Sequence, residues 1–218
     1  DAVLHWHPSS SNAANAESSN SNKSAKFRFT GISAHAAGSP HKGRSALDGV
    51  EAMNMMVNMM REHIPQESRI HYVITKGGLA PNVIPDLAEV YYYVRHPRRE
   101  KVQEIFEWVV EAAEGAAIGT QTDVTYEVMH GNYSKLPNQT LQKVMHKNLL
   151  SRGGIQYSKA EHEYAKKIHQ TLISPGGKIG DQENIRPYST SHTYGSTDVG
   201  DVSWVVPQAG LRLSLIHI

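Results

Sequence analysis

The stretch KFRFTGISAHAAGSPHKGRSALDGV, residues 26–50, decides the fold class of this chain, because it predicts a strand, a loop and the start of a helix in succession. Its opening residues alternate basic side chains with phenylalanines, which predicts a strand with one buried face. A loop of small residues follows, and Ser45 then opens a helix with Asp48 in the position that completes a capping box. The segment therefore predicts a β-α unit.

Outward from this unit, the pattern continues through further strands and a second helix. The first helix keeps an apolar stripe at spacings of three and four as far as Pro65, which ends it. The later elements are a strand in RIHYVITKGG (69–78), a strand in AEVYYYVRHP (88–97), a helix from about Arg99 to Ala117 and a strand in TDVTYEVMH (122–130). The order β-α-β-β-α-β predicts a ferredoxin-like α+β domain, with two helices on one face of an antiparallel sheet. The other face would stay open to another subunit.

The flanking segments differ in character from this central part. Residues 9–24, SSSNAANAESSNSNKS, are rich in Ser and Asn, which predicts an exposed loop or linker with a domain boundary near its end. After Tyr133 we expect a helix from Pro137 to about Ser151, a second helix opened by a capping box of Ser158 and Glu161, and a long irregular stretch over 173–195. We therefore divide the chain into residues 1–24, 25–133 and 134–218.

Composition limits the classes of function. Lys and Arg number 22 and Asp and Glu 21, giving a net charge of +1, so we expect no nucleic-acid partner and no membrane partner. Hydrophobic residues make up 39% of the chain, as in an ordinary globular protein, and a cytoplasmic location is expected. There is no cysteine, so a metal ion would have to be held by His, Asp or Glu.

The two ends of the chain do not read as natural termini. The chain opens on DAVLHWHP, which resembles the middle of a longer sequence, and it closes on the apolar RLSLIHI, residues 212–218. We therefore expect an internal fragment of a longer protein, with residues 212–218 not native sequence.

Several histidines stand where they could carry chemistry. In the strand HWHP, His5 and His7 are two apart and share a face, so one or both could bind a metal, although a His-x-His pair also arises by chance. His35 follows a strand among residues too small to shield it. It is either an ordinary loop histidine or an imidazole presented to something outside its own fold.

Three further positions are candidates for substrate binding. Asn82 lies in PNVIP, where two prolines fix the backbone, although Asn is also a common turn residue. Arg95 ends a strand and could grip a carboxylate with its forked guanidinium, or simply stack on tyrosine. The segment GSTDVGDVS contains Ser196 and Thr197, and it is either a helix start that binds an anion or an ordinary turn.

Three motifs together resemble the family of dinuclear-zinc exopeptidases and amidohydrolases, which includes aminoacylases, carboxypeptidase G and indole-acetyl-amino-acid hydrolases. The motifs are GISAHAAGSPHKGRSALDGVE (31–51), GGLAPNVIPDLAEVYYYVR (77–95) and STDVGDVSWVVP (196–207). The resemblance implies that residues 25–133 are a lid and dimerisation domain inserted in an incomplete α/β zinc-hydrolase catalytic domain. Residues 1–24 would then be a catalytic-domain fragment plus linker, and 134–218 the returning part.

The resemblance also implies roles for single residues. His35 matches a lid histidine that reaches into the partner subunit's active site, where its N–H stabilises an oxyanion. Asn82 and Arg95 match lid residues that hold the substrate's carbonyl or carboxylate, and Ser196 and Thr197 lie where relatives bind substrate. His7 matches a zinc ligand.

The implied function is hydrolysis of the amide bond of small N-acyl amino acids, such as a p-aminobenzoyl-glutamate-like substrate, by a homodimer or a heterodimer with a related subunit. Two zinc or manganese ions would serve the parent enzyme, whose other metal ligands and general base find no match in this sequence. The chain alone would then be inactive, because a catalytic zinc needs about three protein ligands. The alternatives are a non-catalytic dimerisation or interaction module and a ferredoxin-like domain that senses a small molecule.

Overall fold

The computed structural model describes residues 1–175 and 177–214. They form two compact units. We call the first the sheet unit, which comprises residues 20–134 and 194–197. We call the second the terminal unit, which comprises residues 1–19, 135–193 and the described residues from 198 onward. No helix in the described parts of the chain is long and apolar enough to cross a membrane.

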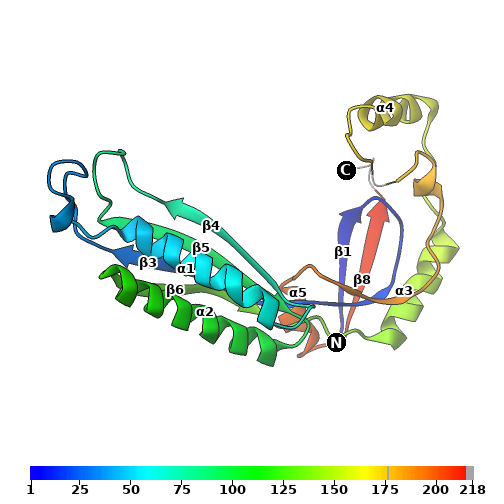
Figure 1. The fold of residues 1–218 in the computed structure, drawn as a ribbon. Helices are drawn as coiled ribbons and strands as arrows, with labels where there is room; N and C mark the ends of the chain where they lie inside the picture. The colour runs from blue at the N-terminus through cyan, green and yellow to red at the C-terminus, as the bar shows by residue number, and fades with distance from the viewer. Residues whose placement is uncertain (176, 215–218) are drawn as a thin grey trace. The chain divides into compact units, whose positions relative to one another are not determined.

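The sheet unit is an antiparallel four-stranded sheet with two helices on one face (Figure 1). Its strands are β3 (Ser21–Thr30), β4 (Arg69–Lys76), β5 (Leu87–His96) and β6 (Asp123–Asn132), in the order β4-β5-β3-β6, and its helices are α1 (Ala46–Met60) and α2 (Arg99–Thr120). This arrangement confirms the predicted β-α-β-β-α-β fold. The short 3-10 turns η1 (Pro40–Lys42) and η2 (Arg61–His63) flank α1.

The core of the sheet unit lies between the sheet and the helices. Phe27 and Tyr92 are fully buried and meet edge to face with ring centroids 5.9 Å apart, and the Tyr92 hydroxyl donates to Asn54 of α1 at 2.5 Å. Helix α1 comes so close to the sheet at Gly49 that a Cβ there would lie 2.4 Å from the Phe29 ring. The alternating pattern of the sequence therefore places the phenylalanines under the helices, as expected.

The opposite, open face of the sheet is polar. Glu89 of β5 is only 3% exposed there, and it accepts hydrogen bonds from Nε of Arg28 at 2.6 Å and from the Thr75 hydroxyl at 2.8 Å, with Lys26 at 3.6 Å. Burial by itself would raise the pKa of Glu89, but these hydrogen bonds and the basic neighbours together lower it. The carboxylate therefore stays ionised and ties three strands together.

The prediction of an exposed linker over residues 9–24 is wrong. Residues 16–19 form strand β2 (Ala16–Ser19), and β3 begins at Ser21. Much of the segment is buried: Asn12 donates from its side-chain amide to the carbonyl of Gln182 at 2.7 Å, and the Ser21 hydroxyl donates to the carbonyl of Asn132 at 2.7 Å. Small polar side chains can be buried when backbone groups satisfy their hydrogen bonds, and composition alone does not reveal that pairing.

The terminal unit is built on two short parallel strand pairs. Strand β1 (Val3–Ser9) pairs with β8 (Gln208–Ser214), and β2 pairs with β7 (Thr190–Thr193). The helices are α3 (Gln139–Arg152), α4 (Lys159–His169) and α5 (Val199–Ser203), with the 3-10 turn η3 (Asp181–Glu183). Helix α3 is capped by Asn138, so it begins two residues after the expected Pro137, whereas the predicted capping box of Ser158 and Glu161 is present.

Two further expectations concerned the stretch 173–195, expected to be irregular, and the tail 212–218, expected not to be native sequence. The stretch 173–195 contains η3 and β7, so it is not irregular throughout. Within the tail 212–218, residues 212–214 belong to β8 and pair with β1, while residues 215–218 lie outside the described residues.

Candidate functional site

The loop that presents His35 is braced by a second loop of the sheet unit. The backbone N–H of Ala36 donates to the carbonyl of Asn82 at 3.0 Å, and the N–H of Ile84 donates to the carbonyl of Ala34 at 2.9 Å. His35 and Val83 thereby form an antiparallel bridge. The structure thus brings the predicted residues His35 and Asn82 together at one end of the sheet.

The imidazole of His35 is exposed and has a defined tautomer. Its Nδ1 accepts the backbone N–H of Gly38 at 2.9 Å and that of Ala37 at 3.3 Å. Because two N–H groups point at Nδ1, the ring proton of the neutral imidazole lies on Nε2. His35 therefore offers an N–H donor to a group outside its own loop.

Asn82 is exposed beside His35. No hydrogen bond of its side-chain amide is found within the described residues, and its own carbonyl is used to brace the loop. The amide is thus available to donate to, or accept from, a bound molecule.

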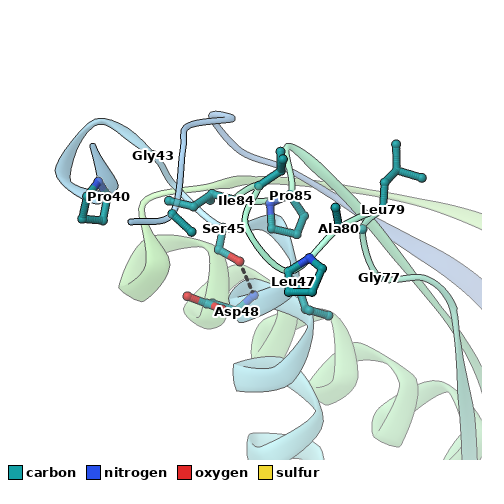
Figure 2. Close-up of a pocket in the computed structure, with 14 residues that line it drawn as sticks. Pro40, Gly43, Ser45, Leu47, Asp48, Gly77, Leu79, Ala80, Ile84 and Pro85 are labelled. Atoms are coloured by element: carbon teal, nitrogen blue, oxygen red, sulfur yellow. Dashed lines mark hydrogen bonds between the residues drawn. The ribbon is translucent and has the colours of Figure 1, made fainter. Parts of the chain in front are cut away.

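A pocket of about 570 Å³ lies between the loops that carry these two residues, since their chain neighbours Ala36, Pro81 and Val83 line it. Figure 2 shows the residues of its lining. Its lining comes from the His35 loop, the first turn of α1 and the loop after β4: Ala36, Pro40, Gly43, Ser45, Leu47, Asp48, Gly77, Gly78, Leu79, Ala80, Pro81, Val83, Ile84 and Pro85. The Ser45 hydroxyl caps α1 by accepting the N–H of Asp48 at 3.1 Å, the dashed line in Figure 2, which confirms one half of the predicted capping box. The reciprocal hydrogen bond from the Asp48 carboxylate to the Ser45 N–H is not found among the described residues. His35 and Asn82 are not among the residues that line this pocket, although both are next to lining residues in the chain.

A second group of predicted residues lies at the other end of β5. The guanidinium of Arg95 donates to the Ser196 hydroxyl at 3.3 Å and lies 5.3 Å from the centre of the Tyr93 ring. The carbonyl of Thr197 accepts a hydrogen bond from the Asn132 side chain at 2.9 Å. The structure therefore brings Arg95, Ser196 and Thr197 together and shows the expected packing of Arg95 on a tyrosine, while the forked grip of Arg95 on a carboxylate stays a prediction.

The two groups are far apart within one chain. The loop of Asn82 leads into β5 at Leu87, and Arg95 lies near the end of the same strand. Eight residues of extended strand span about 26 Å. His35 and Asn82 therefore cannot act on the same small substrate as Arg95 of their own sheet.

The two histidines of β1 differ in their surroundings. Nδ1 of the exposed His7 lies 2.6 Å from the carbonyl of Pro8 and so carries the proton, which leaves Nε2 as a ligand atom. Nε2 of His5 instead contacts the side-chain oxygen of Gln208 at 3.0 Å, and burial is the main cause that lowers the His5 pKa. His7 is the more exposed of the pair, and its role as a metal ligand stays a prediction.

These residues do not complete a metal site. No three His, Asp or Glu side chains of the described residues lie close enough together to hold a metal ion. A catalytic zinc needs about three protein ligands. His7 is thus a single candidate ligand, and the described residues do not fit the two-ion centre that the resemblance implies.

Sequence reasoning missed Arg69. It lies directly opposite Arg95 in the register of β4 and β5. The alternation of residues 69–76 places Arg69 on a face, but the strand pairing that sets it beside Arg95 depends on the loops between, which periodicity does not define.

Known proteins resemble this chain over most of its length. Residues 18–121 match a family described as the peptidase dimerisation domain. The chain is 39% identical over 235 residues to one of the subunits of p-aminobenzoyl-glutamate hydrolase of Escherichia coli (strain K12), which covers 96% of this chain and 49% of that protein. It is 29% identical over 208 residues to Xaa-Arg dipeptidase of Mus musculus, which covers 95% of this chain and 42% of that protein.

A solved structure shows the same fold. An amidase of the hydantoinase/carbamoylase family from Burkholderia vietnamiensis superposes with a TM-score of 0.67 at 14% identity, covering 98% of this chain and 46% of that one. The chain therefore spans about half the length, or slightly less, of the proteins that it matches.

Proposed function

We propose that the whole protein is an amidohydrolase or peptidase that hydrolyses the amide bond of small N-acyl amino acids, because residues 18–121 match the peptidase dimerisation domain and the chain is 39% identical to a subunit of p-aminobenzoyl-glutamate hydrolase. A p-aminobenzoyl-glutamate-like substrate is the first to test, because the E. coli relative is named for it. Residues 25–133 serve as the lid and dimerisation domain in this proposal. Residues 1–24 and 134–218 belong to the catalytic part.

The observation that carries the proposal is the separation of the two residue groups along β5. His35 and Asn82 lie at one end, and Arg95 and Ser196 at the other. In a two-fold dimer each end of one copy can meet the opposite end of its partner. We therefore assign each active site to His35 and Asn82 of one subunit together with Arg95 of the other.

Each residue has a chemical role in this shared site. The Nε2–H of His35 stabilises the negative charge that develops on the carbonyl oxygen during attack, and the amide of Asn82 orients that carbonyl. The guanidinium of Arg95 holds the carboxylate of the amino-acid portion, assisted by the hydroxyls of Ser196 and Thr197. The partner is a second copy of the chain or a related subunit.

Zinc or manganese, as a pair of ions, belongs to the proposal only for the whole protein. His7 would supply one ligand through Nε2. The roles proposed for His35, Asn82 and Arg95 concern the carbonyl and the carboxylate of the substrate, and none of these roles uses a metal ion.

The test is complementation between two inactive variants of the full-length protein, His35→Ala and Arg95→Ala. In a mixed dimer one active site loses both residues and the other keeps both, so activity returns. Random mixing makes half of the dimers mixed, which gives about a quarter of the wild-type activity in a two-fold assembly. A site contained within one chain would give no recovery, and that result would disprove the shared site.

A non-catalytic dimerisation or interaction module is the second candidate, and the match of residues 18–121 to the peptidase dimerisation domain favours it. In that case wild-type full-length protein would dimerise but would release no amine from any N-acyl amino acid tested with added zinc or manganese.

A further inference from the structure

The open face of the sheet carries a row of polar residues at the level of Arg95. In the register of the sheet, Arg69 on β4 pairs with Arg95 on β5, Arg95 pairs with Asn22 on β3, and Asn22 pairs with Asn132 on β6. The Cβ atoms of directly opposite residues lie about 5 Å apart. The side chains of Arg69 and Arg95 therefore leave the sheet side by side on the same face.

The positive charge of this pair is not balanced within the described residues. Neither arginine makes an ion pair there: Arg69 donates to the backbone carbonyls of Gln66 and Ser68 at 2.8 and 2.7 Å, and Arg95 donates to Ser196. Like charges directly opposite in a sheet are destabilising. At the other end of the same face, by contrast, the basic residues surround Glu89.

Both guanidinium groups are held in place rather than dispersed in solvent. Arg69 lies 5.1 Å from the ring centre of Tyr194, and Arg95 lies 5.3 Å from that of Tyr93. In addition, Nε of Arg95 is buried and has no hydrogen-bond partner within the described residues. A buried N–H without a partner costs free energy that a bound acceptor would recover.

The pKa of a neighbouring histidine, His71, is affected by the positive charges of the two arginines. His71 lies two residues after Arg69 on β4, and its pKa is lowered, first by burial and then by the charges of Arg95, Arg61 and Arg69. The electrostatic potential at this end of the open face is therefore positive, and it disfavours protonation of His71.

We propose that Arg69 and Arg95 together bind the two carboxylates of a dicarboxylic amino-acid portion, with Arg69 as the residue that selects the side-chain carboxylate. This inference rests on the proposed function, in which Arg95 holds the main carboxylate. The two arginines are spaced so that the short chain between the carboxyl groups of glutamate can span them. Arg69 thus determines specificity and is not needed for amide hydrolysis as such.

The first test measures binding by calorimetry, without catalysis. Glutarate carries two carboxylates and butyrate one, and we expect full-length wild-type protein to bind glutarate at least about tenfold more tightly. The preference should vanish in Arg69→Gln and persist in Arg98→Gln, which removes one positive charge from an exposed residue of the same unit. Arg69→Lys, which keeps the charge but not the fork, should retain part of it. Equal affinities in wild type, or a preference unchanged by Arg69→Gln, would overturn the inference.

The second test separates this inference from the proposed function. With p-aminobenzoyl-glutamate, Arg69→Gln should lower kcat/KM about tenfold to a hundredfold, mainly through KM, because a hydrogen bond to a charged group is lost. With p-aminobenzoyl-glutamine the loss should be less than about threefold. An equal loss on both substrates contradicts the role of Arg69. Absence of any hydrolysis by wild type contradicts the proposed function instead, while the binding test still decides the inference.

Discussion

Nδ1 of His35 accepts the backbone N–H of Gly38 at 2.9 Å, and this hydrogen bond fixes which ring nitrogen faces outward with a proton. Both residues belong to one loop, so the hydrogen bond is local. In the function that we propose, however, the Nε2–H of His35 acts in the active site of the partner subunit.

Replacement of His35 tests that purpose. We expect His35→Ala in the full-length protein to lower kcat by about a hundredfold or more with little change in KM, because one donor to the developing oxyanion is lost. His41→Ala, in the same exposed loop, is the matched control and should leave kcat unchanged. A loss below about tenfold for His35→Ala would show that the assigned electrostatic role is wrong.

The titration of His71 tests the field around the arginine pair. Its pKa lies below the ordinary value of 6.5, chiefly through burial, with Arg95 as the first of the charged contributors. We expect Arg95→Gln to raise the His71 pKa part of the way back, since burial remains. Histidine ring signals followed by NMR against pH give the value directly. An unchanged midpoint would mean that Arg95 does not act on this side of the sheet.

Glu89 makes the stability of the sheet unit depend on pH. Its pKa in the folded chain is below the ordinary value of 4.5, so its contribution is present above that pH and is lost as pH falls through the folded pKa. We expect Glu89→Gln to cost roughly 1–3 kcal/mol at neutral pH, because charged hydrogen bonds from Arg28 and Thr75 are weakened. The cost should shrink below pH 4.5, where wild-type Glu89 also takes up a proton.

Hydrogen exchange of the β3 and β5 amides measures this stability for the sheet itself. Glu127→Gln is a suitable comparison, because Glu127 also pairs with Arg28, at 2.9 Å, but has a 55% exposed side chain. Its removal should cost less than about 1 kcal/mol. If Glu89→Gln and Glu127→Gln lowered the free energy of unfolding equally, the proposed contribution of the buried Glu89 carboxylate to stability would be wrong.

Gly49 tests how closely α1 approaches the sheet. A Cβ at this position would lie 2.4 Å from the Phe29 ring, which is fully buried, so we expect Gly49→Ala to destabilise the sheet unit by about 1–3 kcal/mol. At Gly119, in α2, a Cβ would have no neighbour within 4 Å. Gly119→Ala should therefore stabilise the helix by up to about 1 kcal/mol. In the same hydrogen-exchange measurement, we expect Gly49→Ala to lower the stability of the sheet unit and Gly119→Ala to raise it.

The periodicity of apolar residues is sufficient to predict the helices and strands of the sheet unit, because each of these elements has one apolar face. The stripe through α1 and the alternating phenylalanines of β3 predict both the elements and the face that they bury. Residues 9–24 escaped this reasoning, since their burial depends on hydrogen bonds such as that of Asn12 to Gln182, far away in sequence.

The sequence motifs predict the candidate residues one by one, but they do not predict how these residues group in space. Motifs singled out His35, Asn82 and Arg95, whereas only the strand register reveals that Arg69 lies opposite Arg95 and that His35 lies at the far end of β5. Register is a property of paired strands, so a single strand read alone does not contain it.

Strand β5 is hydrogen-bonded along its length to β3 on one side and β4 on the other. Because neighbours on both sides restrain such a strand, we expect its Arg95 end and the end that leads back to the Asn82 loop to move together. In the proposed dimer, those two ends serve different catalytic centres. Substrate bound at one active site of this dimer would then change the geometry of the other active site. The two sites would not bind and turn over substrate independently.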